Sequence, residues 1–245
     1  IVVPVKNLQK QYEEDYMKKK YLMKKNRAKM RIAMITGRDN HDSVIYPGVS
    51  CADQFLPDTI LLTEKNRDKI FRYYNENPLI QNKTIPNIRK LKRISIAPSN
   101  PYWSPIRPSD YELNQLTDAK KKHYRGVYGR EYIFYHRKEG CSYYDQFQAY
   151  LDADVIIFNG AKYQIEMAIG RKPETEVDII DEADSFLDNF SRADSLNLNL
   201  LSGSLQTIIL EYEEARLELE KINELLVLEL KNKMALGVNE NQIFS

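Results

Sequence analysis

A short apolar run followed by a cluster of acids constrains this chain more than any other feature of its sequence. The run Val177–Ile180 leads directly into Asp181–Asp184, which reads Asp-Glu-Ala-Asp. A run that is short, β-branched and nearly uncharged predicts a strand buried on both faces of a parallel sheet. Acids at the carboxyl end of such a strand face the crevice in which α/β sheets bind ligands.

The acidic cluster has two interpretations. In the first, Asp181 holds Mg²⁺ through water and Glu182 polarises an attacking water, as in folds that hydrolyse nucleotides. In the second, Asp181 or Asp184 caps a helix that begins near Ser185, because carboxylates stabilise helix amino ends. The tetrapeptide by itself does not decide between them.

Length and composition favour one α/β domain that carries a large insertion or appendage. The chain has 245 residues, 42% of them hydrophobic, with a mean hydropathy of −0.56. No stretch approaches the roughly 18 apolar residues of a membrane span, and Ile1–Val5 lacks the charged leader of a secretory signal. We therefore expect no membrane partner and a location in the nucleus or in the cytoplasm with the nucleoid, not secretion. The start at Ile1, in what reads as the middle of a strand, favours a piece of a longer protein.

The net charge of +1 hides a division along the chain. Residues 1–140 hold 28 Lys and Arg against 15 Asp and Glu, whereas residues 141–245 hold 8 against 20. This asymmetry favours a polyanion as partner of the first part, and a metal or a basic partner for the second. The alternative is that the two parts pack on each other.

Hydrophobic periodicity predicts strands that alternate with helices, which is typical of a mostly parallel sheet. The predicted strands cover residues 1–5, 30–36, 153–158 and 177–181. The predicted helices cover residues 7–25, 66–74, 109–124, 143–151 and 161–168. Residues 78–108 contain six prolines and resist regular assignment. Residues 205–236 predict a long Leu- and Glu-rich helix that needs a partner surface, as half of a helical hairpin or as an oligomerising coil.

Five segments together carry a resemblance to a known family. They are Val3–Tyr12, Thr36–Asn40, Gly140–Tyr144, Ala153–Asn159 and Val177–Asp184. In this order the chain resembles superfamily 2 helicases of the XPD/DinG type, which move 5′ to 3′ along single-stranded DNA. The segments look like motif Ia, the opening of the iron–sulfur insertion, its closing cysteine motif, the strand that follows, and the Walker B motif. Five ordered segments are far more specific than one tetrapeptide.

The resemblance implies a fold and a domain organisation. We expect a partial RecA-like parallel sheet, belonging to the first motor domain, over residues 1–36 and 141–190. Residues 37–140 would form an irregular or helical iron–sulfur-type insertion, enlarged and poor in cysteine. Residues 191–245, with their long helix, would start a helical arch-like domain.

The resemblance also implies roles for named residues. ATP and Mg²⁺ would be the cofactors, with Asp181 positioning Mg²⁺, Glu182 acting as general base and Asp184 coupling the site to its neighbours. DNA contacts would fall to Lys6, Asn7, Gln9 and Arg38. The implied partners are single-stranded or forked DNA and proteins of repair or transcription complexes.

One departure from the family concerns the nucleotide site. The sequence contains no Gly-x-x-x-x-Gly-Lys-Ser/Thr phosphate loop, which in the family lies before the position of Ile1. The second motor domain with its arginine finger is also absent. We expect that this chain alone does not hydrolyse ATP.

The other departure concerns the [4Fe-4S] cluster, for which the family uses four cysteines. This sequence has only Cys51 and Cys141, and Ser43 and Asp58 stand near the other two positions. Because cluster irons are normally held by thiolates, we expect no stable cluster. A zinc site that combines both cysteines with His41 or His136 matches no familiar spacing, and two free thiols are the simplest interpretation.

The insertion offers further candidates for nucleic-acid contacts. Basic runs lie at 18–31, 89–93 and 120–122, and they favour either a phosphate-binding surface or a solvated face. Aromatic residues among them suit either the stacking of unpaired bases or core packing. These are Tyr102, Trp103, Tyr124, Tyr128, Tyr132 and Tyr135.

Two rival functions remain open from the sequence. The first is a non-catalytic DNA-binding or scaffold module derived from such a helicase. The second is a nuclease-type or metal-binding α/β protein that uses Asp178 together with Asp181, Glu182 and Asp184. Alternation along a strand places Asp178 away from the cluster at the strand end, which counts against the second.

Overall fold

The computed structural model describes residues 1–81, 84, 87–188, 198, 201–202, 205 and 213–235. The chain divides into two compact units. The first comprises residues 1–85 and 93–187, and the second comprises residues 86–92 and 188–245. None of the helices in the described ranges has the length and apolar content that a bilayer-spanning segment needs.

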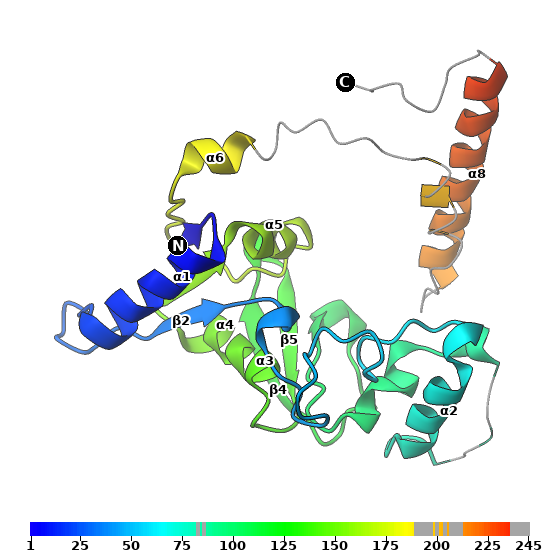
Figure 1. Cartoon of the computed structure of the whole chain (residues 1–245), viewed down its shortest axis with the longest axis horizontal. Coiled ribbons are helices and arrows are strands. Elements are labelled where there is room, and N and C mark those ends of the chain that lie inside the picture. The colour runs from blue at the N-terminus through cyan, green and yellow to red at the C-terminus, as the bar shows by residue number, and fades with distance from the viewer. Residues whose placement is uncertain are drawn as a thin grey trace. The chain divides into compact units, whose positions relative to one another are not determined.

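A small parallel sheet lies in the first unit (Figure 1). Its strands are β1 (Val2–Val3), β2 (Ile32–Ile35) and β6 (Val155–Asn159), in the order β1-β6-β2. All three strands were predicted. Each is a short run made mostly of Val, Ile and other apolar residues, and such residues favour strands. The strands supply fully buried side chains such as those of Ile35 and Ile157.

The segment 177–181 extends this sheet through one parallel bridge, between Ile180 and Val2. The Val2 N–H donates to the Ile179 carbonyl at 2.7 Å, and the Asp181 N–H donates to the Val2 carbonyl at 2.9 Å. Val177 and Ile179 are 71% and 57% exposed. The prediction of a strand buried on both faces is therefore wrong, although the segment does follow the sheet.

Helices follow the strands as the alternation predicted. They are α1 (Lys6–Glu13), which continues as a π-helical turn over Glu14–Lys19, α5 (Gly160–Ala168) and α6 (Ala183–Asp188). Helices α1 and α5 both contact β1 and β6. The chain is thus mixed α/β, as predicted, with a parallel sheet of modest size.

The insertion contains an antiparallel sheet that the sequence did not predict. Its strands are β3 (Ile106–Pro108), β4 (Lys120–Arg125) and β5 (Glu131–His136), in the order β3-β5-β4. The predicted helix over residues 109–124 is wrong, because β4 pairs along its whole length with β5. Lysines favour such an edge strand, where charge discourages pairing with other chains. Helix α2 (Arg67–Glu76) confirms the helix predicted at residues 66–74.

A helical connection and a chain of aromatic rings join the insertion to the parallel sheet. The connection consists of α3 (Ser142–Asp145), a 3₁₀ turn and α4 (Ala149–Asp152). Rings pack along it in the pairs Phe134–Phe147, Tyr124–Tyr150 and Tyr150–Phe158, with centroids 5.5–6.3 Å apart. Both sheets therefore share one hydrophobic core.

This core decides the role of most aromatic residues of the insertion. Trp103, Tyr124, Tyr132 and Tyr135 are all buried within it, so core packing is confirmed for them and base stacking is not available. Tyr128 differs, since it is 79% exposed.

In the second unit, α8 (Glu213–Ala235) confirms the long helix over much of its predicted range. Apolar side chains on it are exposed, namely Leu217, Ile222, Leu225, Val227 and Leu228. Most of residues 191–212 lies outside the described residues. Of the predicted arch-like domain, the structure therefore describes mainly this helix.

Gln9 ties α1 to the parallel sheet. Its side chain is buried, at 1% exposure, and its amide nitrogen donates to the carbonyl oxygens of Ile35 (3.0 Å) and Ile157 (3.1 Å). One side chain thus satisfies two buried acceptors on neighbouring strands, β2 and β6. This is a structural role, which counts against the prediction that Gln9 contacts DNA.

We predict that Gln9→Leu lowers the free energy of unfolding by about 2–4 kcal/mol, because two buried carbonyls lose their donor. Urea unfolding followed by circular dichroism measures this change. Gln11→Leu is the matched control, since Gln11 is exposed on the same helix, and it should change stability by no more than about 0.5 kcal/mol. Equal effects of the two substitutions would contradict the structural role.

A buried carboxylate with two cations lies beside the aromatic chain. Glu166 is fully buried. Its carboxylate accepts two hydrogen bonds from Arg171, at 2.5 and 2.7 Å, and forms an ion pair with Lys162 at 2.8 Å. Burial alone would raise the pKa of the Glu166 carboxyl, but the hydrogen bonds and charges of Arg171 and Lys162 outweigh it and lower this pKa. The ionised carboxylate therefore stabilises the fold.

We predict that Glu166→Gln lowers the free energy of unfolding at pH 7 by about 3–5 kcal/mol, because two partly buried cations lose their partner. A lowered folded-state pKa means that this contribution is complete above the ordinary value of 4.5 and disappears as the pH falls below it. Unfolding curves from pH 7 to pH 3 should therefore converge for the two proteins. Glu174→Gln, in an exposed pair with Arg125, should cost only about 0–1 kcal/mol at any pH.

Candidate functional site

The carboxyl ends of the parallel strands define one edge of the first unit. Lys6 follows β1, Thr36 follows β2, Gly160 follows β6, and Asp181 follows the bridged residue Ile180. Because parallel strands end at the same edge, segments far apart in sequence meet here. The acidic cluster lies at the edge where α/β folds bind ligands.

Asp181 is held by a hydrogen bond from the first helix. The Tyr12 hydroxyl donates to Asp181 Oδ2 at 3.0 Å. Burial and the hydrogen bond to Asp181 raise the pKa of Tyr12, so the phenol remains a donor at neutral pH. Tyr12 contacts Oδ2, and among the described residues Oδ1 shows no hydrogen bond, so this oxygen can take a further partner.

Glu182 marks the change from extended chain to helix. Its φ of 51° lies in the left-handed region, which is uncommon for a residue with a side chain and which recurs at functional sites. Its carbonyl accepts from the Phe186 N–H at 3.1 Å, so it stands directly before α6. The side chains of Glu182 and Asp184 are exposed. Asp184 lies in the first turn of α6, where a carboxylate also stabilises the helix.

Asp178 belongs to a different group of side chains. Its carboxylate accepts from Tyr163 at 3.0 Å and Thr175 at 2.9 Å, and pairs with Lys172 at 3.1 Å. No three His, Cys, Asp or Glu side chains within the described ranges are grouped so that they could hold a metal ion. The nuclease-type reading, which needs Asp178 beside the acidic cluster, therefore has no support in this arrangement.

Lys6 and Asn7 are exposed at the same edge. Lys6 Nζ lies 2.5 Å from Asp39 Oδ2, and this hydrogen bond lowers the pKa of the Asp39 carboxyl. The pair joins the start of α1 to the 3₁₀ turn Arg38–Asn40. A polyanion at this edge would therefore compete with Asp39 for Lys6.

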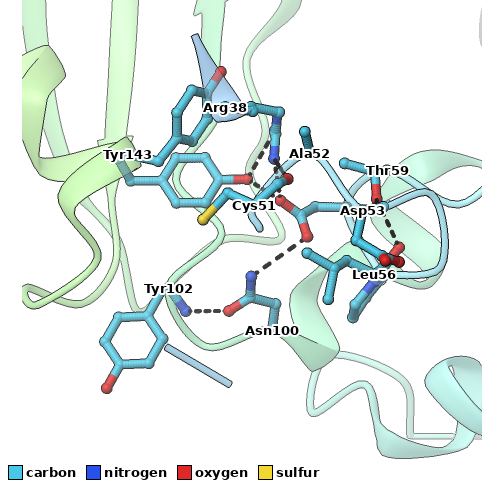
Figure 2. A network of polar contacts seen from close by, with 12 residues as sticks. Arg38, Cys51, Ala52, Asp53, Leu56, Thr59, Asn100, Tyr102 and Tyr143 are labelled. Atoms are coloured by element: carbon cyan, nitrogen blue, oxygen red, sulfur yellow. Dashed lines mark hydrogen bonds and ion pairs between the residues drawn. The ribbon is translucent and has the colours of Figure 1, made fainter. Parts of the chain in front are cut away.

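Arg38 lies in a second, more buried network (Figure 2). Its Nη1 donates to Asp58 Oδ2 at 2.7 Å and to the Cys51 carbonyl at 3.3 Å, and its Nη2 donates to the Tyr144 hydroxyl at 3.1 Å. The Tyr144 hydroxyl in turn donates to Asp58. The guanidinium also lies 4.3 Å from the centre of the Tyr143 ring. Both terminal nitrogens of the Arg38 guanidinium have protein partners, which counts against the prediction that Arg38 contacts DNA.

Cys51 and Cys141 are both buried, at 5% and 3% exposure, and both belong to the shared hydrophobic core. The Cys51 thiol donates to the Asp42 carbonyl at 3.4 Å. Cys141 is the largest influence on the pKa of the Cys51 thiol and raises it, and Cys51 in turn lowers the pKa of the Cys141 thiol.

The other two positions do not complete a cluster site. The Asp58 side chain is only 2% exposed, and Arg38 and Tyr144 engage its carboxylate. Ser43 is buried, and its hydroxyl accepts from the Tyr46 N–H at 3.3 Å. Two thiols with a neutralised carboxylate do not fit the four-thiolate set that holds a [4Fe-4S] cluster.

The histidines considered for a zinc site have other partners. His41 lies 2.6 Å from Thr36 Oγ1 and 2.8 Å from Ser142 Oγ. His136 lies 3.0 Å from Asp145 Oδ1 and 3.1 Å from Lys122 Nζ. Each ring is thus fixed by two polar groups, and the described residues give no support to a mixed Cys–His site.

Sequence reasoning missed two tyrosines, Tyr12 and Tyr144. Tyr12 ends the segment that resembles motif Ia, and its hydroxyl carries no sequence signal for a contact with Asp181. Tyr144 had a usable signal, because it lies three residues after Cys141 in the segment that resembles the closing cysteine motif.

Comparison with known proteins adds no assignment: no protein-family model, no curated protein and no solved structure matches this chain.

We predict that Asp58→Asn lowers the free energy of unfolding by about 3–5 kcal/mol, because the partly buried Arg38 guanidinium loses its counter-charge. Guanidinium chloride unfolding at neutral pH measures the loss. Asp110→Asn is the control, since its pair with Arg130 is exposed, and it should cost at most about 1 kcal/mol. A loss for Asp58→Asn no larger than that of the control would show that the network does not stabilise the insertion.

Proposed function

We propose that this chain forms the middle of the first motor domain of an ATP-dependent 5′ to 3′ DNA helicase of the XPD/DinG type. The observation that carries the proposal is the position of Asp181 and Glu182 at the carboxyl edge of a parallel sheet, next to the segment that resembles motif Ia. The order of the five resembling segments supports it. On this proposal the sheet is part of a RecA-like fold.

In this function Asp181 would hold Mg²⁺ with one carboxylate oxygen. Magnesium in nucleotide sites is commonly bound by one or two carboxylates, with waters and phosphates completing its shell. A site with a single protein carboxylate therefore suits Mg²⁺, even though no three-ligand group occurs in the described part of the chain. The bound ion would neutralise charge on the transferring phosphoryl group.

The chain's own residues would orient the reactants. Tyr12 fixes the Asp181 carboxylate through its hydroxyl. The left-handed backbone at Glu182 leaves the exposed carboxylate of this residue at the sheet edge, where it would hold the attacking water and accept its proton. Asp184, in the first turn of α6, would couple the site to neighbouring segments.

DNA contacts would fall to Lys6 and Asn7, which are exposed at the same edge. Three lysines at the end of the first helical segment, Lys18–Lys20, are also exposed and would extend a phosphate-binding surface. Gln9 and Arg38 would act indirectly, Gln9 by fixing α1 on the sheet and Arg38 by fixing the turn that contains Asp39. The proposed ligand is single-stranded or forked DNA.

We predict that Glu182→Gln reduces ATP hydrolysis at least about 100-fold, because the water loses its general base, while nucleotide binding changes little. The measurement uses the protein that contains this chain together with a phosphate loop, with single-stranded DNA present. Glu176→Gln is the control, since Glu176 is exposed six residues earlier, and it should retain hydrolysis.

Normal hydrolysis by Glu182→Gln would defeat the assignment of the general base. A wild-type protein that binds single-stranded DNA but hydrolyses no ATP would replace the helicase by the non-catalytic DNA-binding module.

A further inference from the structure

The chain turns back between the end of the first helical segment and the start of β2 (Figure 1). This turn, residues 20–31, is called the basic hairpin here. One antiparallel bridge joins Met23 to Lys29 within it, and the Lys24 N–H donates to the Ala28 carbonyl at 2.8 Å. Because β2 begins directly after the basic hairpin, the hairpin lies at the amino edge of the parallel sheet. The acidic cluster lies at the opposite, carboxyl edge.

Two ion pairs hold the basic hairpin against the chain that precedes β6. Lys24 Nζ lies 2.7 Å from Asp154 Oδ1, and Arg31 Nη2 lies 2.6 Å from Asp152 Oδ2. The Arg31 N–H also donates to Asp154 Oδ2 at 2.9 Å. The base of the hairpin is therefore attached to the sheet, and its tip has a defined position.

The other cations of the basic hairpin face solvent. Of its six Lys and Arg residues, Lys24 and Arg31 alone form ion pairs with described residues. The remaining four are exposed, namely Lys20, Lys25, Arg27 and Lys29. Arg27 stands at the turn with a φ of 64°, a left-handed backbone that is uncommon for a residue with a side chain and recurs at functional sites. Four cations that repel one another on one hairpin suit a partner that supplies phosphates.

Aromatic side chains lie among these cations. Tyr21 is 57% exposed, and Lys29 Nζ lies 3.6 Å from the centre of its ring. Lys29 also lines a cavity of about 370 Å³ at the base of the hairpin. The other residues that line it are Tyr16, Met30, Arg31 and Ile32. This volume is at the small end of the range for ligand pockets, and a tyrosine with two cations in its wall suits a flat, anionic ligand.

These features together match the chemistry of an unpaired nucleic-acid strand. Proteins that bind such strands pair Lys and Arg with the phosphates and stack the bases on aromatic rings. An anionic membrane would also attract the cations. The basic hairpin exposes only two large apolar side chains, Tyr21 and Met23, whereas segments that lie in a membrane interface present a whole apolar face.

We propose that the basic hairpin and the cavity beside it bind a single nucleic-acid strand. Lys25, Arg27 and Lys29 pair with successive phosphates, and unpaired bases stack on Tyr21 and enter the cavity beside Tyr16. The surface lies away from the carboxyl edge of the sheet, and ATP takes no part in it. The proposal therefore goes beyond the proposed function and holds whether or not the chain belongs to a helicase.

The first test measures binding of the full chain to a fluorescent DNA single strand of about 20 nucleotides, by fluorescence anisotropy over a range of salt concentrations. The triple variant Lys25→Gln, Arg27→Gln, Lys29→Gln should bind at least about tenfold more weakly at about 100 mM salt. The slope of log K against log salt should become shallower by about 2, because three phosphate contacts on a single strand are lost. Circular dichroism checks that the variant is folded.

The chain contains a matched control for this variant. Lys65, Arg67 and Lys69 repeat the same three residue types at the same spacing, and all three are exposed around the start of α2. Replacing them together by Gln changes the net charge equally. We expect this control to keep the affinity and the salt dependence of the unsubstituted chain.

The second test separates stacking from charge. Tyr21→Leu should weaken binding of the DNA strand about fivefold or more, because a base loses its aromatic partner. It should leave binding of inorganic polyphosphate, which has no bases, unchanged. Tyr128→Leu is the control, since Tyr128 is exposed on the distant turn between β4 and β5, and it should change neither affinity.

Three results would overturn the proposal. The first is equal loss of affinity in the two triple variants, or no binding of the strand even at about 50 mM salt. The second is binding that Lys6→Gln removes and the hairpin variant retains, which would leave the helicase proposal standing. The third is hairpin-dependent binding to vesicles that contain phosphatidylserine without binding to the DNA strand, which would assign the hairpin to a membrane surface.

Discussion

The buried ion pair between Arg38 and Asp58 is the interaction on which the arrangement of the insertion depends. It joins the start of the loop after β2 to a residue 20 positions later, and through Tyr144 it reaches the helical connection that leads to β6. The Asp58 side chain is only 2% exposed, so its charge must lie within hydrogen-bonding distance of a cation. Apolar packing sets no such requirement on the position of a side chain. The pair therefore fixes where the loop lies, and Cys51 follows, because its carbonyl accepts from the same guanidinium.

The same pair bears on the resemblance to a cluster-binding insertion. A carboxylate is a poor substitute for a thiolate at iron, but it is a good partner for an arginine. With Asp58 paired to Arg38, this position stabilises the fold through an ion pair that needs no metal.

The sequence predicted the parallel part of the fold because local hydrophobic pattern determines it. Strands β1, β2 and β6 and helix α5 each show the expected periodicity over a single segment. The antiparallel sheet was not predictable in this way, because β4 reads as a charged run and becomes a strand only through pairing with β5. Likewise, nothing local distinguishes the buried amide of Gln9 from an exposed one, since its acceptors on β2 and β6 are 26 and 148 residues away. The site was predictable in its acids, which follow a recognisable apolar run, but not in Tyr12, whose role arises from the packing of α1.

The two sites differ in how they are held, and this difference has a functional consequence. The edge with Asp181 rests on one β-bridge and one tyrosine hydroxyl, and Val177 and Ile179 beside it are largely exposed. The network around Arg38 and Asp58 rests on an ion pair, a cation over an aromatic ring and a shared core. In the proposed motor domain, the site at Asp181 must rearrange as nucleotide is bound and released, and elements that move come from the less stable parts of a fold.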